Sequence, residues 1–512
     1  MPRKIPFHPV LFAVFPVLNY WLLNKDVVLS HSTWRTLGVC AVSALMLQAI
    51  FSMLLQSLDR GAFLASLLVV IFLYFGQTYY SISAGRTDDR LSHIFLAGWL
   101  SLLLFGSYLI LRKRKAHPGL SNTLNLVSIV LLIVPIFGTA RARWEHQTPQ
   151  HRATNELLNY AASPQAGNQL PDIYYIVLDS YGRGDVLSKL YGLDNSGFLD
   201  ALRARGFYVA EEGHANYIQT TLSLGSALDA GYFDPAQFTS GSKDRTGFQS
   251  YLDNTQVLKT LRQWGYEIDS TQDAIDFLQL DVSDKILGAN QRVNTFQLGF
   301  DLMTLDSLWD HDLYDYKLWQ LVQAQLDGLE SPWLASGPPH FVFAHILSPH
   351  PPFSFDARGN FVPSAIGQNG HTNIPESGRA EYISGYRTQV QYLNYRVIEI
   401  LDHIQSHTDR TAIILLQGDH GPGVYLDFSS AANSCLQERF SILNAYYFPD
   451  AATQARLYPV ISPVNTFRLV FSELLGKTIP FLDDRSYFST WDKPYEFLDN
   501  TDTRDTCSPL KK

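Results

Sequence analysis

Cysteine is scarce in this chain, which holds three in 512 residues. Cys40 lies in an apolar stretch, where a lone cysteine is expected to be a small buried side chain. Cys435 and Cys507 remain, so at most one disulfide can form between them, and it requires an oxidising compartment. The sequence alone leaves open whether these two residues are close enough to pair.

Positive charge is scarce beyond residue 150. Of the 39 Lys and Arg residues, 13 lie in residues 1–150, whereas 43 of the 48 Asp and Glu residues follow that segment. So acidic a region argues against binding of nucleic acid, which needs a basic surface. It also indicates that a metal ion, rather than a patch of Lys and Arg, handles any anionic substrate.

A signal-peptide cleavage site is missing as well. Arg3 and Lys4 precede an apolar core, as in a signal peptide, but no small-x-small pattern lies before Asp26. The first apolar stretch is therefore expected to be retained as a helix, although Pro9 and Pro16 weaken it. The chain also has no internal repeat and no low-complexity tract.

Long apolar runs dominate the first 150 residues instead. Three of them are long and apolar enough to cross a bilayer as helices, and a fourth is acceptable. With the retained first stretch, we expect a bundle of five transmembrane helices over residues 1–140. These runs lack buried charges, which argues against a transporter because transport paths usually need them. The five stretches are residues 7–23, 37–58, 61–82, 94–111 and 123–140.

Basic residues orient this predicted bundle. The densest basic run, residues 112–115, follows the fourth stretch, and Arg3 and Lys4 precede the first. The positive-inside rule places both in the cytoplasm. Five crossings then put everything after residue 140 outside. We therefore expect a multi-pass protein of the inner or plasma membrane, with a cytoplasmic N-terminus and an extracytoplasmic or periplasmic C-terminal domain.

The rest of the chain divides into a polar linker over 141–170, an α/β domain over 171–500 and a tail over 501–512. Alternating strands and helices predict a mainly parallel central sheet covered by helices. Ser462 and Pro463 mark the start of a further helix, since serine is a good N-cap and proline suits the first helical position. Predicted strands are 172–178, 266–270, 341–346, 411–417 and 440–448; predicted helices include 197–205, 254–264 and 381–406.

Two predicted strands end in groups that bind metals. Asp419 and His420 follow the apolar run 412–416, and Asp179 follows the run 173–178. Open α/β sheets bind ligands at the carboxyl ends of their strands. Divalent metals accept oxygen and nitrogen donors together. The sequence therefore predicts one metal site built by the fold, although an Asp-His pair after a strand is also typical of a simple turn.

Thr220 is a candidate nucleophile or phospho-group ligand. The apolar spacing from Leu222 predicts a helix that places Thr220 at its N-terminus, where unpaired N–H groups attract anions. An ordinary N-cap is the competing interpretation, and Thr221 is an adjacent alternative. His350, on a proline-rich loop after the run 341–344, is a second candidate, and His345 a third.

These motifs resemble the alkaline-phosphatase/sulfatase superfamily in its membrane-anchored branch, which includes lipoteichoic acid synthases and phosphoethanolamine transferases. The resemblance covers the whole plan of the chain. It implies that Asp179, Asp419 and His420 bind a metal, that Thr220 binds it too and acts as nucleophile, and that His350 faces the substrate. Gly421 and the serines at 223 and 226 are in register with the family motifs. The implied cofactor is one divalent ion: Mn²⁺, Zn²⁺, Mg²⁺ or Ca²⁺.

Departures from the family pattern narrow the chemistry. The Cys-x-Pro-x-Arg motif that sulfatases convert to formylglycine is missing, and position 220 is threonine. This disfavours sulfate-ester hydrolysis and favours phospho-group chemistry. The two transferase families carry glutamate where Asp179 stands. An additional Asp-x-x-x-His ligand set is not found, so one tightly bound metal is expected.

The resemblance implies a metal-dependent transferase or hydrolase of phospho-groups that works through a covalent threonine intermediate. His350 would stabilise or protonate the leaving group, and His345, Arg439 and Asn216 would contact substrate; Arg439 is equally typical of a surface ion pair. A lipid-linked donor and an envelope glycan or lipid acceptor would explain the membrane anchor. Two alternatives stay open: a hydrolase of free sulfate or phosphate esters, and a non-catalytic scaffold in envelope assembly.

Overall fold

The structure is a computed structural model that describes residues 5–83, 89–112, 118–145, 169–238, 241–288, 295–305, 312–331, 334, 337–364, 373–407 and 410–508. The chain forms two compact units. One comprises residues 1–147 and 294–314, and the other comprises residues 148–293 and 315–512. Most of the predicted linker, residues 146–168, lies outside the described residues, whereas residues 141–145 continue a helix.

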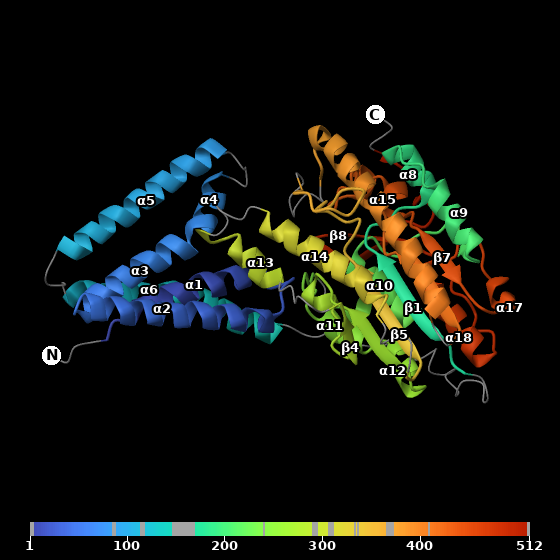
Figure 1. Ribbon diagram of the computed structural model, residues 1–512, viewed down its shortest axis with the longest axis horizontal. Helices are drawn as coiled ribbons and strands as arrows, with labels where there is room; N and C mark the ends of the chain where they lie inside the picture. The colour runs from blue at the N-terminus through green and yellow to red at the C-terminus, as the bar shows by residue number, and fades with distance from the viewer. Residues whose placement is uncertain are drawn as a thin grey trace. The chain divides into compact units, whose positions relative to one another are not determined.

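The first unit is helical, and within its described residues three helices are long and apolar enough to cross a membrane. They span Trp34–Leu54, His93–Arg112 and Gly119–Arg141. These three helices correspond to the predicted stretches 37–58, 94–111 and 123–140. The first predicted stretch forms α1, which is apolar but has only 16 residues, so five crossings are not confirmed. The helices are α1 (His8–Leu23), α2 (Trp34–Leu54), α3 (Leu58–Leu73), α4 (Phe75–Ser83), α5 (Asp89–Arg112) and α6 (Pro118–Glu145), drawn in Figure 1.

The predicted single helix over 61–82 is wrong, because α3 ends at Leu73 and α4 begins at Phe75. Residues 302 and 303, far along the sequence, contact the chain at this break. The backbone N–H of Gln77 donates to the carbonyl of Met303 at 3.2 Å. A Cβ on Gly76 would lie 2.5 Å from the carbonyl oxygen of Leu302, so only glycine permits the approach.

That segment belongs to the helical unit although it lies within the predicted α/β domain. Helix α13 (Thr295–Asp301) carries Phe296 and Phe300, whose rings lie 5.3 and 6.0 Å from that of Tyr20 on α1. Both phenylalanines are buried in the core of this unit. The pairing depends on contacts between residues almost 300 positions apart, so no local pattern in the sequence indicates it.

The second unit is built on a seven-stranded sheet with the order β2-β7-β6-β1-β5-β3-β4. The strands β6, β1, β5, β3 and β4 are parallel, and β7 is antiparallel to β6. Strands β1, β5 and β6 are buried throughout, which agrees with their mainly apolar sequences. The strands are β1 (Asp172–Leu178), β2 (Tyr208–Val209), β3 (Glu267–Thr271), β4 (Lys285–Leu287), β5 (His340–Ile346), β6 (Ala412–Gly418) and β7 (Asn444–Tyr447).

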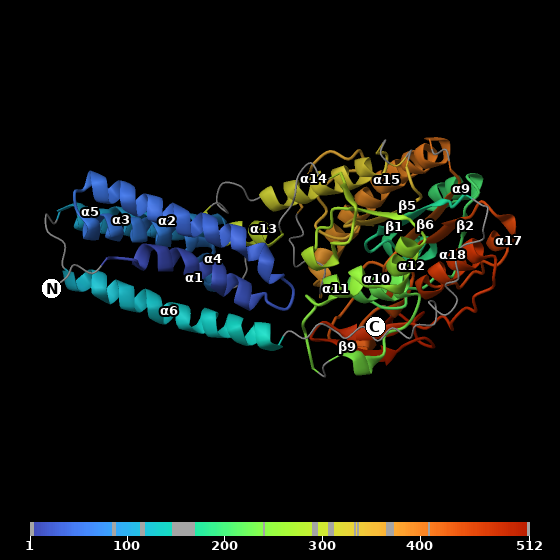
Figure 2. The same cartoon turned by 90° about the horizontal axis from the view of Figure 1, so that it is seen from below.

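Helices cover both faces of this sheet, with α14 and α15 on one side and α10, α12 and α18 on the other in Figure 2. The first face buries alternate β1 residues such as Tyr174 and Ile176 against α15. The second packs Tyr175 against Phe467 of α18 with ring centroids 5.2 Å apart. The helices are α8 (Gly184–Tyr191), α9 (Ser196–Ala204), α10 (Thr220–Asp229), α11 (Phe248–Asp253), α12 (Gln256–Gln263), α14 (Leu313–Gly328), α15 (Glu376–His407), α16 (Leu436–Phe440), α17 (Ala451–Gln454) and α18 (Thr466–Leu475).

One predicted strand in the C-terminal part of the chain needs correction. The strand predicted over 440–448 is wrong in its first half, because α16 ends at Phe440 and β7 begins only at Asn444. Phe440 and Ile442 are fully buried, and an apolar run indicates burial without fixing the type of element. A small hairpin of β8 (Tyr487–Thr490) and β9 (Lys493–Asp499) comes before Cys507, which forms a disulfide with Cys435.

Candidate metal and phospho-transfer site

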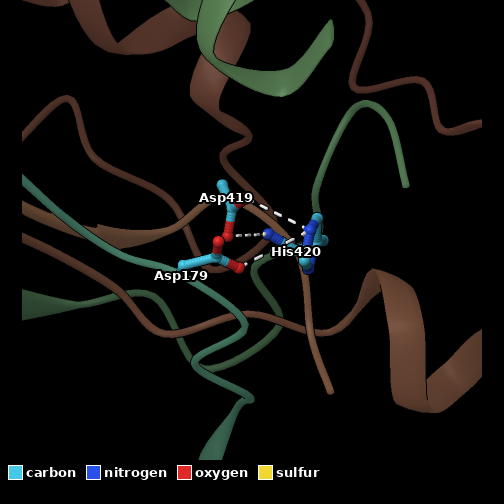
Figure 3. Close-up of side chains that lie close together, drawn as sticks. All are labelled: Asp179, Asp419 and His420. Atoms are coloured by element: carbon cyan, nitrogen blue, oxygen red, sulfur yellow. Dashed lines mark hydrogen bonds and ion pairs between the residues drawn. The ribbon is translucent and has the colours of Figure 1, made fainter. Parts of the chain in front are cut away.

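Two neighbouring strands deliver the central carboxylates. Strands β1 and β6 are parallel, with Leu178 opposite Gly418, so the next residues, Asp179 and Asp419, leave the sheet at the same edge. Both side chains are buried, and Figure 3 shows them facing each other beside His420. Gly418 is needed here because a Cβ at this position would lie 2.4 Å from the carbonyl oxygen of Tyr181.

Ser180 ties the two carboxylates together, a role that the sequence analysis missed. Its backbone has a φ of 67°, which is uncommon outside glycine and is typical of residues held in functional sites. This conformation lets its N–H donate to Asp419 Oδ1 at 3.0 Å, while its hydroxyl donates to Asp179 Oδ1 at 3.0 Å. Its position directly after Asp179 was the available signal.

His420 turns one ring nitrogen toward the carboxylates. Nδ1 lies 3.1 Å from the carbonyl oxygen of Gly421, so an Nδ1–H can donate there and leave a lone pair on Nε2. Nε2 lies 3.2 Å from Asp419 Oδ2 and 3.8 Å from Asp179 Oδ1 (Figure 3). The ligand atoms of these three buried residues all lie within 4.8 Å of one another.

Thr220 joins this cluster from another element. It is the first residue of α10, and its hydroxyl oxygen lies 3.0 Å from His420 Nε2. Thr221 is buried in the helix, whereas Thr220 is partly exposed, so the geometry favours Thr220. The two serines that match the family motif form hydrogen bonds to the backbone. The Ser223 hydroxyl donates to the carbonyl of Tyr217, and the Ser226 hydroxyl donates to the carbonyl of Ser223.

The charges of the cluster are strongly coupled. Burial acts to raise the pKa of Asp179, but the neighbouring His350, His345 and His420 outweigh it and lower that pKa well below its ordinary value. Burial, with repulsion from Asp179, raises the pKa of Asp419 to about 7. Burial and the guanidinium of Arg439 hold the pKa of His420 well below its usual range, so its ring is neutral and its lone pair is available.

These residues fit a divalent cation. Asp419 Oδ2 is buried and has no hydrogen-bond partner, which is costly for a carboxylate in the interior. Two carboxylates, a neutral imidazole and a hydroxyl offer the mixed oxygen and nitrogen donors that divalent transition metals accept. A cation bound by Asp179, Asp419, His420 and Thr220 would satisfy that oxygen and relieve the repulsion between the two carboxylates.

His345 forms a buried hydrogen-bonded pair with Asp273 beside the cluster. Its Nδ1 lies 2.7 Å from Asp273 Oδ2, and its Nε2 lies 3.6 Å from Asp179 Oδ2. Burial disfavours the charged ring, yet the two carboxylates raise the pKa of His345 well above its ordinary value. His345 is among the residues predicted from the sequence, whereas Asp273 is not. The rule that drew attention to Asp179 applies here too, because Asp273 follows the end of β3.

His350 and Arg439, two further predicted site residues, both lie near the cluster. His350 is partly buried, and its Nδ1 lies 2.5 Å from the carbonyl oxygen of Pro351, with Asp179 near enough for the two charges to interact. Arg439 is 5 % exposed, so the alternative of a surface ion pair is wrong. Its guanidinium donates to the carbonyls of Ile218 and Gly421 and to His420 Nε2 at 2.9 Å.

Asn216 is not brought to the cluster. Its side-chain NH₂ donates to the hydroxyls of Tyr232 and Ser462 and to the carbonyl of Arg485, and its oxygen accepts from the N–H of Val464. Both ends of its amide are therefore used in holding neighbouring loops together.

Comparison with known proteins identifies the α/β unit. The family model described as Sulfatase matches residues 171–457. The chain is similar in fold to the periplasmic domain of EcEptC from Escherichia coli in complex with Zn, at 14% identity and a TM-score of 0.42, covering 67% of this chain and 95% of that chain.

Two further structures show the same similarity of fold. The integral membrane lipooligosaccharide phosphoethanolamine transferase A from Neisseria meningitidis matches at 10% identity and a TM-score of 0.41, covering 91% of this chain and 95% of that chain. A Bacteroides thetaiotaomicron structure described with glycosaminoglycan metabolism matches at 14% identity and a TM-score of 0.41, covering 64% and 83%. No protein with a curated description matches the sequence.

Proposed function

This chain belongs to the sulfatase family, within the alkaline-phosphatase/sulfatase superfamily, and we propose that it is a metal-dependent enzyme that transfers or hydrolyses phospho-groups through a covalent bond to Thr220. The observation that carries the proposal is the hydroxyl of Thr220 at the start of α10, 3.0 Å from His420 Nε2 and beside the paired carboxylates. The missing Cys-x-Pro-x-Arg motif favours phospho-group over sulfate chemistry.

The metal would be held by Asp179, Asp419, His420 and Thr220. When bound, a divalent ion supplies positive charge that lowers the pKa of a coordinated hydroxyl and neutralises a phosphate. Arg439 donates to His420 Nε2, the nitrogen that would hold the ion, while its other donors reach the carbonyls of Ile218 and Gly421. The N–H that faces Nε2 would then be available for an anionic oxygen of the substrate.

Thr220 attacks phosphorus in line with the leaving group. Its oxygen forms the new bond to phosphorus, its proton passes to solvent, and the bond from phosphorus to the leaving oxygen breaks. His350 stabilises or protonates that oxygen through Nε2 when both of its ring nitrogens carry a proton, because its Nδ1–H is occupied by the carbonyl of Pro351. It regains the proton from the water or acceptor hydroxyl in the second step. Water or an acceptor hydroxyl then attacks phosphorus and releases the threonine. Attack by water in this second step gives hydrolysis, and attack by an acceptor hydroxyl gives transfer.

The proposal places this chemistry outside the cytoplasm, next to a membrane. Three helices are long and apolar enough to span a bilayer, and the basic run at 112–115 favours a cytoplasmic end after the fourth stretch. The disulfide between Cys435 and Cys507 adds support, because such bonds persist in oxidising compartments. We propose five crossings, an inner-membrane location, a lipid-linked donor and an envelope glycan or lipid acceptor.

A substrate panel tests the proposal. The full chain in detergent is incubated with Mn²⁺ and with an aryl phosphodiester, an aryl phosphomonoester or an aryl sulfate. We expect cleavage of a phosphate ester that is lost with chelator and in Thr220→Ala but kept in the neighbouring Thr221→Ala. Equal activity in wild type and Thr220→Ala would refute the nucleophile. Cleavage of the sulfate alone would favour the sulfate-ester hydrolase, and no turnover of any ester would favour a scaffold.

A further inference from the structure

A second cluster of titratable side chains lies at the opposite edge of the sheet. Strands β3 and β5 begin at Glu267 and His340, which are register partners, and Asp269 is two residues further along β3. Side chains two apart in a strand share a face, so all three point the same way. His345, at the catalytic edge, is five residues from His340 along β5, which corresponds to roughly 17 Å.

The three side chains are close together and shielded from solvent. His340 Nδ1 lies 2.7 Å from Asp269 Oδ2 and 3.9 Å from Glu267 Oε2. The side chains of His340 and Asp269 are both 0% exposed, and that of Glu267 is 31% exposed. One ligand atom from each residue lies within 4.8 Å of the others.

Carboxylate oxygens in this region are left without hydrogen bonds. Asp269 Oδ1 and Glu267 Oε2 are buried and have no hydrogen-bond partner among the residues that the structure describes, and the same holds for Oδ2 of the adjacent Asp172. A buried, unsatisfied carboxylate oxygen is expensive, so several in one place call for a positive partner. This distinguishes the cluster from acidic groups on an exposed surface, which water satisfies.

The nearby arginine is committed elsewhere. Arg410 Nε lies 3.1 Å from Asp172 Oδ1, and its two terminal nitrogens donate to the carbonyls of Gly337 and Pro338. Asp172 Oδ1 also accepts from the backbone N–H of His340 at 2.8 Å. The ion pairs that Glu267 and Asp269 make at this edge go to His340, a single ring facing two carboxylates.

We propose that Glu267, Asp269 and His340 bind a zinc ion that clamps β3 to β5, at a site separate from the catalytic one. Nitrogen with two carboxylate oxygens suits Zn²⁺, whereas Ca²⁺ and Mg²⁺ prefer oxygen alone. Ligands about 2 Å from a tetrahedral ion stand about 3.3 Å from one another. The observed 2.7 and 3.9 Å bracket that separation, so shifts of about half an ångström complete the site.

Metal stoichiometry tests this site. The full chain in detergent is saturated with Zn²⁺, dialysed, and analysed for zinc per chain by mass spectrometry of the element. Glu267→Gln is the main variant because this side chain is partly exposed and its loss is least harmful to folding. Asp269→Asn is the second variant, and Asp281→Asn, an exposed aspartate on the segment after β3, is the matched control.

The expected result is one zinc fewer per chain in Glu267→Gln and in Asp269→Asn than in wild type and Asp281→Asn. Glu267→Gln should keep its esterase activity, because the catalytic cluster lies at the other end of the strands. Zinc binding should also raise the melting temperature of wild type more than that of Glu267→Gln. An unchanged zinc content in Glu267→Gln, with the fold intact by circular dichroism, would overturn the proposal and leave a buried His–Asp pair.

Discussion

Asp273 holds the ring of His345 in place, with Oδ2 at 2.7 Å from Nδ1, and so directs Nε2 of that ring at Asp179 from 3.6 Å. Replacing a carboxylate that orients a histidine at a metal centre typically lowers metal affinity or activity by about 10- to 100-fold. We therefore expect Asp273→Asn to lower kcat on a phosphate ester by about 10- to 100-fold. Asp281→Asn, on the exposed surface, should leave kcat unchanged. A wild-type rate in Asp273→Asn would show that His345 needs no support from Asp273.

Arg439 connects the nucleophile loop to the metal-binding turn. Its guanidinium donates to the carbonyls of Ile218 and Gly421, two residues before Thr220 and one after His420 respectively. Lysine has a single ammonium group that cannot reproduce this planar fork. We expect Arg439→Lys to lower the melting temperature and to lose most activity. Arg205→Lys, whose arginine pairs with Asp402 on the surface, is the control and should change neither.

The disulfide should stabilise the α/β unit. Cys435 and Cys507 are 72 residues apart, and closing a loop of that length in the unfolded chain is worth roughly 4 kcal/mol. We expect the double variant Cys435→Ala/Cys507→Ala to melt at a lower temperature than wild type and to be insensitive to a reducing agent. Thermal unfolding with and without reductant measures both effects. Equal melting temperatures for wild type and the double variant would contradict the expectation.

Asp253 should make stability depend on pH. Burial, with repulsion from Asp281, raises the pKa of Asp253 to about 6 from an ordinary value of 3.8. The folded state therefore binds more protons than the unfolded state between about pH 4 and 6. The free energy of unfolding consequently falls as the pH rises through that window. Asp253→Asn should flatten this part of the stability profile relative to wild type. Parallel melting curves for the two proteins from pH 4 to 7 would refute the assignment.

Much of the α/β unit follows from its sequence because its signals are local. The strands contain the apolar runs 173–178, 341–344 and 412–416, and each run is followed within three residues by a side chain that the parallel sheet brings to one edge: Asp179, His345 and Asp419. The register of β1 against β6 then explains why Asp179 and Asp419 meet. The helix start at Thr220 was visible in the same way, from apolar spacing downstream.

The features that the sequence did not reveal depend on distant contacts. The break at Tyr74 reflects packing by residues 302 and 303, and an apolar pattern shows only that the surrounding stretch is hydrophobic. Ser180 acquires its role through a left-handed backbone conformation that no composition rule signals for serine. The resemblance implies that Asn216 contacts substrate, whereas in the structure its amide bonds to distant loop residues.

The most direct test of the central claim is the mass of the covalent intermediate. The full chain in detergent is incubated with Mn²⁺ and a membrane phospholipid extract, quenched in acid, digested and analysed by mass spectrometry beside Thr220→Ala and Thr221→Ala. We expect a phospho-group on the peptide that contains Thr220 in wild type and Thr221→Ala, and none in Thr220→Ala. An adduct that persists in Thr220→Ala, or one that maps to another residue, would contradict it.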